Sequence, residues 1–236
     1  MNAHTAYNKA VAAQKRMPEL EPTIMQDADW AYWYAKDIIK DRWVEAEPII
    51  MKSGLYAYFY ALEIIAARWP EAEPYIMEDL ENVHSYVRSI IKGRWLEAEP
   101  VIMRDAYWSF RYAREVIEGR WPDAEPIIMQ NNYGYEYAID IIGGRWPEAE
   151  SYIMQDEYSA YYYAKDVIKG RWPEGEEAIA KSSYKNFYIE MFFDEPVVTK
   201  NKVDIIQWER MNLPGYFAPA SLFEPKTSLL DIMVDE

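Results

Sequence analysis

The feature that most constrains this chain is a unit of about 26 residues that recurs about seven times. A typical copy starts at Arg68 and reads R-W-P-E-A-E-P-Y-I-M over its first ten residues. Self-similarity at a fixed period of about 20–50 residues is typical of stacked repeat proteins. We number the repeats 1 to 7 by their leading arginines, which are spaced by 26 residues except for one step of 25: Arg16, Arg42, Arg68, Arg94, Arg120, Arg145 and Arg171.

Composition narrows the class of protein and of partner. Half of the 236 residues are hydrophobic, which is enough to bury a substantial core. The formal net charge of −15 argues against nucleic acid or an anionic membrane as a direct partner, because like charges repel. The chain has no cysteine, and no apolar run approaches the ~20 residues that span a bilayer. We therefore expect a soluble cytoplasmic protein, without excluding basic or DNA-binding protein partners.

Each repeat predicts two helices. The first carries Pro-Glu-Ala-Glu-Pro and should span roughly eight to ten residues. Its start is ambiguous by one turn, because proline fits the first helical position but breaks a hydrogen bond further in. The second helix should begin at a column of residues whose side chains cap helix starts. That column contains Asp27, Ser53, Asp79, Asp105, Asn131, Asp156 and Ser182.

The second helix carries an apolar stripe and a predicted stop signal. In repeat 1 the stripe contains Ala31, Tyr34, Ala35, Ile38 and Ile39, spaced as on one face of a helix. Glycine at the helix exit can adopt the left-handed conformation without steric cost. We expect this role for Gly93, Gly119, Gly144 and Gly170, and less ideal exits where Asp41 and Ala67 replace glycine.

The predicted fold is therefore all-α: an α-solenoid of about seven short two-helix repeats within residues 1–193. Residues 1–15 resemble the second half of a repeat and should cap the array. The 25-residue step, near Gly134, should produce a local irregularity. Residues 194–236 leave the repeat and contain four prolines together with large apolar side chains. We expect them to form an irregular C-terminal segment that packs on the last repeat.

Two sets of recurring residues have a functional and a structural interpretation. Acids follow each leading arginine at the third and fifth positions, from Glu19 and Glu21 to Glu174 and Glu176. Paired carboxylates suit acid–base catalysis or cation binding, but acids in a first helical turn also complement the helix dipole and pair with arginine. Because an active site is used once, sevenfold recurrence favours a structural ladder of Arg42, Arg68, Arg94, Arg120, Arg145 and Arg171.

Two aromatic columns recur as regularly. By the same reasoning they indicate core packing rather than stacking platforms for bases or sugars. They contain Trp43, Trp69, Trp95, Trp121, Trp146 and Trp172, and Tyr34, Tyr60, Tyr86, Tyr112, Tyr137 and Tyr163.

Aromatic residues that do not recur strictly are the better candidates for binding. They lie beside the stripe, at positions where other repeats carry Asn82, Ser85, Arg111 or Ser159. An exposed aromatic patch on a rigid array is typical of a partner-binding surface, although packing between repeats is the alternative. The candidate surface contains Trp30, Trp33, Tyr56, Phe59, Trp108 and Tyr162.

Signals of catalysis are weak. His4 and His84 are the only histidines, and they lack the spacing of a zinc or nucleophile site. The sequence contains no glycine-rich phosphate loop and no nucleophile-elbow or metalloprotease motif. We expect no enzyme activity, no cofactor and no metal.

The unit R-W-P-E-A-E-P-x-I-M-x-D resembles a short tandem repeat found in proteins encoded by tailed bacteriophages, over roughly residues 16–180. The resemblance implies a helical array made in an infected bacterial cell and carries no catalytic residues.

Three functions remain open. The first is a protein-interaction module that presents variable side chains on a constant frame. The second is an acidic nucleic-acid mimic that blocks a DNA-binding or defence protein, and the third is a virion structural component.

Overall fold

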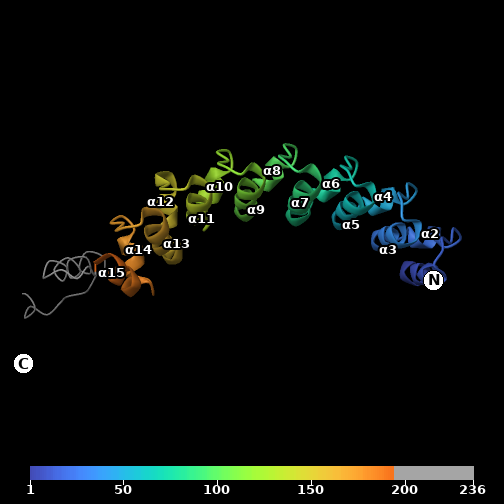
Figure 1. Ribbon diagram of the computed structural model, residues 1–236, viewed down its shortest axis with the longest axis horizontal. Coiled ribbons are helices and arrows are strands. Elements are labelled where there is room, and N and C mark those ends of the chain that lie inside the picture. Colours follow the sequence, from blue (N-terminus) through green and yellow to red (C-terminus); the bar gives the residue numbers. More distant parts are fainter. Residues whose placement is uncertain (194–236) are drawn as a thin grey trace, which may run out of the picture. The chain divides into compact units, whose positions relative to one another are not determined.

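The computed structural model describes residues 1–193, and all regular structure within that range is helical. Pairs of helices recur every 26 residues or so, as the α-solenoid prediction requires (Figure 1). The chain divides into two compact parts at Gly143 and Gly144, with repeats 1–5 in the first part and repeats 6–7 in the second. The prediction for residues 194–236 lies outside the described residues.

The first helix of each repeat is shorter than the sequence predicted. The seven helices are α2 (Glu21–Ile24), α4 (Glu47–Ile50), α6 (Glu73–Ile76), α8 (Glu99–Ile102), α10 (Glu125–Met129), α12 (Pro147–Ile153) and α14 (Glu176–Ala180). In the first five, the second proline of the motif occupies the first turn of the helix, and the residues before it form turns. Proline at this position prevents the helix from starting one turn earlier, because proline has no backbone N–H to donate to the preceding turn.

Repeat 6 shows the effect of losing that proline. Ser151 stands in its place, and α12 begins one turn earlier, at Pro147. Repeat 7 has Glu177 at this position, but Gly175 replaces the alanine of the other repeats and α14 starts only after it. Glycine is a poor helix former and accounts for the later start.

The second helices are α3 (Ala28–Tyr34), α5 (Gly54–Tyr60), α7 (Leu80–Tyr86), α9 (Ala106–Tyr112), α11 (Gly134–Tyr137), α13 (Glu157–Tyr162) and α15 (Lys185–Phe193). Helices α3, α5, α7 and α9 lie side by side in Figure 1, each in contact with the next. Five predicted caps occupy the N-cap position, and four of them accept a backbone hydrogen bond: Asp27, Asp79, Asp105 and Asp156. Ser53 holds the position without such a bond.

The other two cap predictions are wrong, and for one reason. The Asn131 side chain donates to the Ile127 carbonyl, and α11 starts after Tyr133. Ser182 lies in a turn before α15. In every repeat, the backbone N–H of the residue after the leading arginine donates to the hydroxyl of a buried tyrosine. The two residues are 16 positions apart in these two repeats and 17 in the others. The chain is therefore one residue too short for the second helix to start at the cap column. The irregularity expected near Gly134 is thus confirmed.

Six of the second helices continue into a π-helical segment, which the sequence did not predict. The segments are η1 (Ala35–Ile39), η2 (Ala61–Ile65), η3 (Val87–Ile91), η4 (Ala113–Ile117), η5 (Ala138–Ile142) and η6 (Tyr163–Ile168). Hydrogen bonds there reach five residues back rather than four, as from the Lys92 N–H to the Val87 carbonyl at 2.7 Å. The wider turn rotates the end of the apolar stripe away from the core, so Ile38 and Ile39 are only half-buried.

The predicted glycine stops are misplaced by one residue. The left-handed residue that ends each π segment stands immediately before the expected glycine. It is a non-glycine residue in five repeats and Gly143 in the sixth: Lys40, Ala66, Lys92, Glu118 and Lys169. Gly93, Gly119, Gly144 and Gly170 have no positive φ. The helix exit therefore lies one residue earlier in the chain than the sequence predicted.

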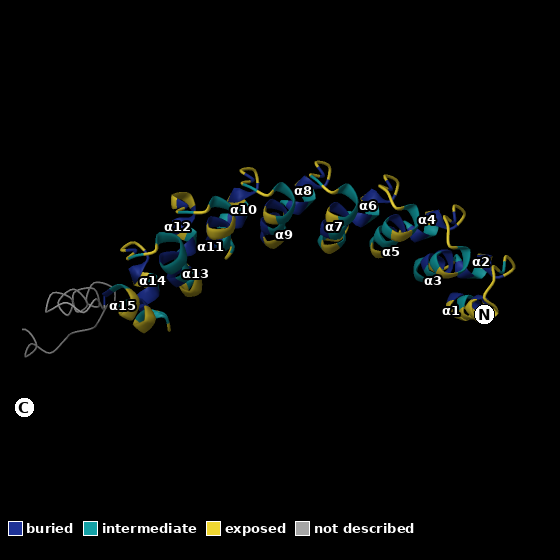
Figure 2. Cartoon of the chain, viewed as in Figure 1, coloured by how far each residue is buried: buried dark blue, intermediate teal, exposed yellow. Residues whose placement is uncertain are grey.

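The core confirms the interpretation of the regular aromatic columns. Every tryptophan and tyrosine of those columns is at most 3% exposed, and the alanines at Ala31 and Ala35 are fully buried. At the N-terminus, α1 (Ala3–Ala13) packs on α2 and α3 through Ala3, Ala6 and Ala10. Figure 2 shows exposed loops between the repeats, which carry the leading arginines.

Candidate functional site

Each repeat contains one buried polar network, and repeat 4 shows its geometry. Arg94 donates from Nε and Nη2 to the two carboxylate oxygens of Glu99, at 2.7 and 2.8 Å. The Tyr112 hydroxyl donates to Glu99 Oε1 at 3.2 Å and accepts from the Trp95 backbone N–H at 2.7 Å. Burial raises the pKa of Tyr112 to about 12, with the Glu99 carboxylate adding to it and the Trp95 N–H opposing it.

All seven repeats make this network, so it is part of the frame. The glutamates are 3–9% exposed, and they are Glu21, Glu47, Glu73, Glu99, Glu125, Glu150 and Glu176. Repeat 7 keeps it through Tyr188, although its sequence has lost the second proline and the methionine. The other acid of each pair, three residues after the arginine, is exposed in every repeat. Only half of the acidic ladder is therefore available to a partner.

The candidate aromatic surface is best formed in repeats 1 and 2. Trp33, Tyr56 and Phe59 are half-buried, and their rings surround Tyr32 with centroids 5.1, 5.5 and 6.1 Å from its ring. Tyr32 itself is 2% exposed. We call these four residues the Tyr32 cluster. Two successive helices, α3 and α5, fix its rings in place.

Charged groups border the Tyr32 cluster. Lys36 Nζ lies 4.8 Å from the Trp33 ring centroid and forms an ion pair of 2.7 Å with Glu63. The Tyr32 hydroxyl donates to the same carboxylate. Burial would raise the pKa of Glu63, but the bonds from Lys36 and Tyr32 outweigh it and lower that pKa. The cluster thus combines partly exposed rings with a polar edge, as many binding surfaces do.

The structure places the other predicted surface residues elsewhere. Trp30 stacks on His4, with centroids 4.3 Å apart, and Trp108 packs on His84 at 5.3 Å. Tyr162, in the second compact part, contacts Tyr158 at 4.4 Å. All three are half-buried and contact rings of their own or an adjoining repeat. Packing between repeats therefore accounts for part of their burial.

Two rings outside the candidate surface are more exposed than its members. Tyr107 is 40% exposed and Tyr158 is 45% exposed, while Leu55 in the same repeat position is 45% exposed. This position is the second residue of the second helix, beside the Trp30 position. The residue at this position is an acid in repeats 1 and 3 and is apolar in repeats 2, 4 and 6. That variation is the signal by which the sequence could have indicated these exposed side chains.

A second ladder of polar contacts, which the sequence did not predict, joins successive repeats. In four of the π segments an acid receives contacts from the preceding part of the array. Glu63 pairs with Lys36, Glu115 with Arg88, and Asp140 with Arg114. The tyrosine position of the preceding repeat adds a hydrogen bond, as from Tyr7 to Asp37 at 2.6 Å. This ladder varies from repeat to repeat, whereas the buried Arg–Glu–Tyr network does not.

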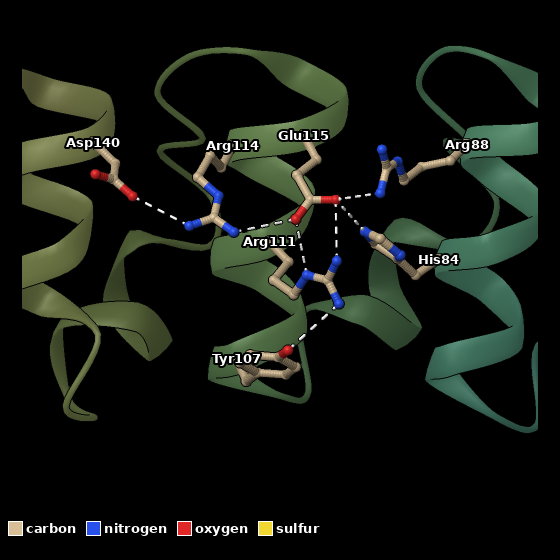
Figure 3. Close-up of polar contacts among 7 residues, drawn as sticks. All are labelled: His84, Arg88, Tyr107, Arg111, Arg114, Glu115 and Asp140. Atoms are coloured by element: carbon tan, nitrogen blue, oxygen red, sulfur yellow. Dashed lines mark hydrogen bonds and ion pairs between the residues drawn. The ribbon is translucent and has the colours of Figure 1, made fainter.

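The second ladder is densest at Glu115 (Figure 3). Arg111, one turn earlier on the same helix, contacts both of its carboxylate oxygens at 2.9 and 3.2 Å. Arg114 lies 3.2 Å away, and Arg88 reaches across from the preceding repeat to 2.9 Å. Burial would raise the pKa of Glu115, but the Arg111 and Arg114 bonds prevail and lower it to about 2.

His84 completes this cluster from the preceding repeat. Its Nε2 lies 3.1 Å from Glu115 Oε2, and the residue is 6% exposed. Burial, followed by the charge of Arg111, lowers the His84 pKa. Neutral imidazole therefore predominates at pH 7. Within residues 1–193, no group of three or more His, Cys, Asp or Glu side chains is arranged to hold a metal ion.

No family, no curated protein and no solved structure matches the chain. Among the described helices, none is both long and apolar enough to cross a membrane.

Proposed function

We propose that the protein is a non-enzymatic interaction module whose Tyr32 cluster binds a partner protein. The observation that supports this is the geometry of Trp33, Tyr56 and Phe59. Three half-exposed rings are held on two helices around one buried tyrosine. Rings fixed in this way lose little conformational entropy on binding, and aromatic anchors commonly dominate interface energy.

The chemistry of the partner follows from charge. The chain carries a net charge of −15, and the third-position acid of every repeat is exposed. A partner with an apolar patch bordered by basic groups would complement both features, with the charges accelerating its approach. The resemblance to phage-encoded repeats makes a host or phage protein in an infected bacterial cell the first candidate.

Nucleic-acid mimicry receives less support. Duplex DNA carries a charge every ~1.7 Å along its axis. Here the fifth-position acids are buried and paired with arginine, so one ladder acid per repeat remains exposed. Any mimicry would have to rely on other surface acids.

The test compares capture of bacterial lysate proteins by the wild-type chain and by the double variant Trp33→Ser and Phe59→Ser. Serine already occupies this repeat position at Ser85, so the melting temperature should fall little. For a partner purified from the capture, affinity should weaken by about 2 kcal/mol or more, which is the usual size of an aromatic hot spot. The binding would be measured by titration calorimetry at low and high salt.

A matched control removes a ring outside the cluster. Phe187 is 59% exposed on α15, and Phe187→Ser should leave the affinity unchanged. Salt-resistant binding that depends on Trp33 and Phe59 supports the proposal. Salt-labile capture of DNA-binding proteins, unaffected by the double variant, would instead favour mimicry. An unfolded double variant would show that these rings are core.

A further inference from the structure

Repeat 3 departs from the pattern at two positions, Ser85 and Ser89, which stand four residues apart on the continuous helix of α7 and η3. Ser85 stands where repeats 1 and 2 carry Trp33 and Phe59, and its small side chain leaves space. Ser89 stands in the acid column, where all other repeats with a π segment carry Asp or Glu. The second ladder therefore loses its carboxylate at this point.

The two serines line a shallow depression of about 260 Å³. Its other lining residues are Tyr58, His84 and Arg88. The Tyr58 hydroxyl lies 3.4 Å from Ser89 Oγ, so the hydroxyl groups of two repeats meet there. Three hydroxyls and a guanidinium can all donate hydrogen bonds, and none of the five lining residues is acidic.

The charge of Arg88 is only partly used within the protein. Its side chain is 55% exposed, and its contact with Glu115 involves Nη1, one of three guanidinium nitrogens. Glu115 is already held by Arg111 and Arg114. The three arginines outnumber the two carboxylates of this cluster, Glu115 and Asp140, by one. A local positive charge thus remains on a chain that is strongly acidic.

We propose that this depression binds a phosphoryl-type oxyanion. Arg88 supplies the charge, and the hydroxyls of Tyr58, Ser85 and Ser89 supply hydrogen bonds. A phosphoryl group offers three strong acceptor oxygens. It can therefore accept hydrogen bonds from more of these four side chains than a carboxylate, which has only two oxygens. The group can belong to a free phosphate or to a phosphorylated side chain of a partner protein. This site does not depend on the binding function proposed for the Tyr32 cluster.

The experiment titrates the full chain with inorganic phosphate and, separately, with a phosphoserine peptide of otherwise neutral residues. Backbone amide shifts of Ser85 and Ser89 are followed by NMR at constant ionic strength. Saturable shifts at these two residues are expected. Tighter binding of phosphate identifies a free anion as the ligand, whereas tighter binding of the peptide identifies a phosphorylated partner.

Two variants borrow residues that the array already accepts. Ser89→Glu restores the acid found at Glu63, and Arg88→Leu follows Leu62. Each should weaken binding by about tenfold or more, since one adds a like charge and the other removes the cation. Both should retain the wild-type melting temperature within a few degrees.

Lys36→Leu is the matched control, because Lys36 occupies the Arg88 position in repeat 1 and carries the same charge. It should leave phosphate binding unchanged. The proposal is overturned if neither ligand shifts Ser85 and Ser89. It is equally overturned if Ser89→Glu binds as wild type does, or if Lys36→Leu weakens binding as much as Arg88→Leu.

Discussion

At the scale of single residues, the frame depends on one buried carboxylate in each repeat. Glu99 is 7% exposed and receives hydrogen bonds from Arg94 and Tyr112. Arg94 itself is about half exposed, so the pair lies at the edge of the core. A carboxylate in this position is stable only while its donors are present, because an unpaired buried charge is costly.

Arg94→Ala should therefore destabilise the protein by about 1–3 kcal/mol, since it removes two hydrogen bonds from a buried acid. Chemical denaturation would measure the change. Glu97→Ala provides the control, because Glu97 is the exposed acid of the same repeat and should cost less than ~0.5 kcal/mol. Equal effects of the two variants would refute the assignment of Glu99 to the frame.

Glu115 predicts a dependence of stability on acid pH. Its pKa is about 2 in the folded protein, below the usual ~4.3 of an unfolded glutamate. Between these values the unfolded state binds more protons, so stability falls as pH falls from about 4 to about 2. The contribution present above that range should be about 2–3 kcal/mol.

The measurement is urea unfolding of wild type and Glu115→Gln at several pH values. The difference in unfolding free energy between the two should shrink as pH falls through this range, because the wild-type carboxylate becomes protonated. A difference that stays constant down to pH 2 would contradict the low pKa.

How far residues could be assigned from sequence depends on whether their partners recur with the repeat. Glu99 could be paired with Arg94 because both belong to one repeat and stand five residues apart. Glu115 could not be paired with Arg88, because that contact joins two repeats and is absent where Leu62 or Ile139 replaces the cation. Sequence periodicity reports what repeats share, and the candidate sites lie where they differ.

At the scale of helices, the sequence predicted the starts better than the ends. Asp27 and Asp79 signal a start by their own side-chain chemistry, which acts locally. The switch from α- to π-helical hydrogen bonding at Ala35 or Val87 has no comparable signal, since the apolar spacing fits either form over one turn. The position of the left-handed residue depends on that switch, so the prediction moved it to the adjacent glycine.

The corrected position can be tested at Lys92 and Gly93. Lys92 has φ of 56°, a conformation that costs a non-glycine residue roughly 1–2 kcal/mol. Lys92→Gly removes that strain but makes the unfolded chain more flexible, so a net gain of up to ~1 kcal/mol is expected. Thermal unfolding would measure it.

Gly93→Ala is the companion change. Gly93 has no positive φ, and open space surrounds the position of its missing Cβ. Alanine there should be neutral or stabilise by up to ~1 kcal/mol. If Gly93→Ala destabilised the protein and Lys92→Gly did not stabilise it, the left-handed residue would lie at Gly93 after all.

At the scale of the whole molecule, the effect of one buried network on stability is repeated in all seven repeats. Each repeat buries one tyrosine hydroxyl beside a carboxylate, and burial raises its pKa in every case. The seven tyrosines are Tyr34, Tyr60, Tyr86, Tyr112, Tyr137, Tyr163 and Tyr188. Arginine stays charged throughout this range, so the tyrosines dominate the alkaline response.

We predict a steep alkaline unfolding transition. The pKa values of Tyr86, Tyr112 and Tyr137 are about 12, against about 10 in an unfolded chain. Between these values the folded state retains protons that the unfolded state releases, so stability falls as pH rises. Each tyrosine removes up to ~1.4 kcal/mol per pH unit.

Repeats 1–5 contain five such tyrosines, and domains of this kind have a total stability of only ~5–15 kcal/mol. The first compact part should therefore unfold within about one to two pH units above pH 10. The part of the tyrosinate absorbance that comes from the network tyrosines should rise only as the circular dichroism changes, because their ionisation requires unfolding. Tyr112→Phe should be less stable at neutral pH, since Glu99 and the Trp95 N–H lose a partner. Its stability should nevertheless fall less steeply with pH than that of wild type. Ionisation of all 21 tyrosines with unchanged helicity would show that these hydroxyls are not buried as described.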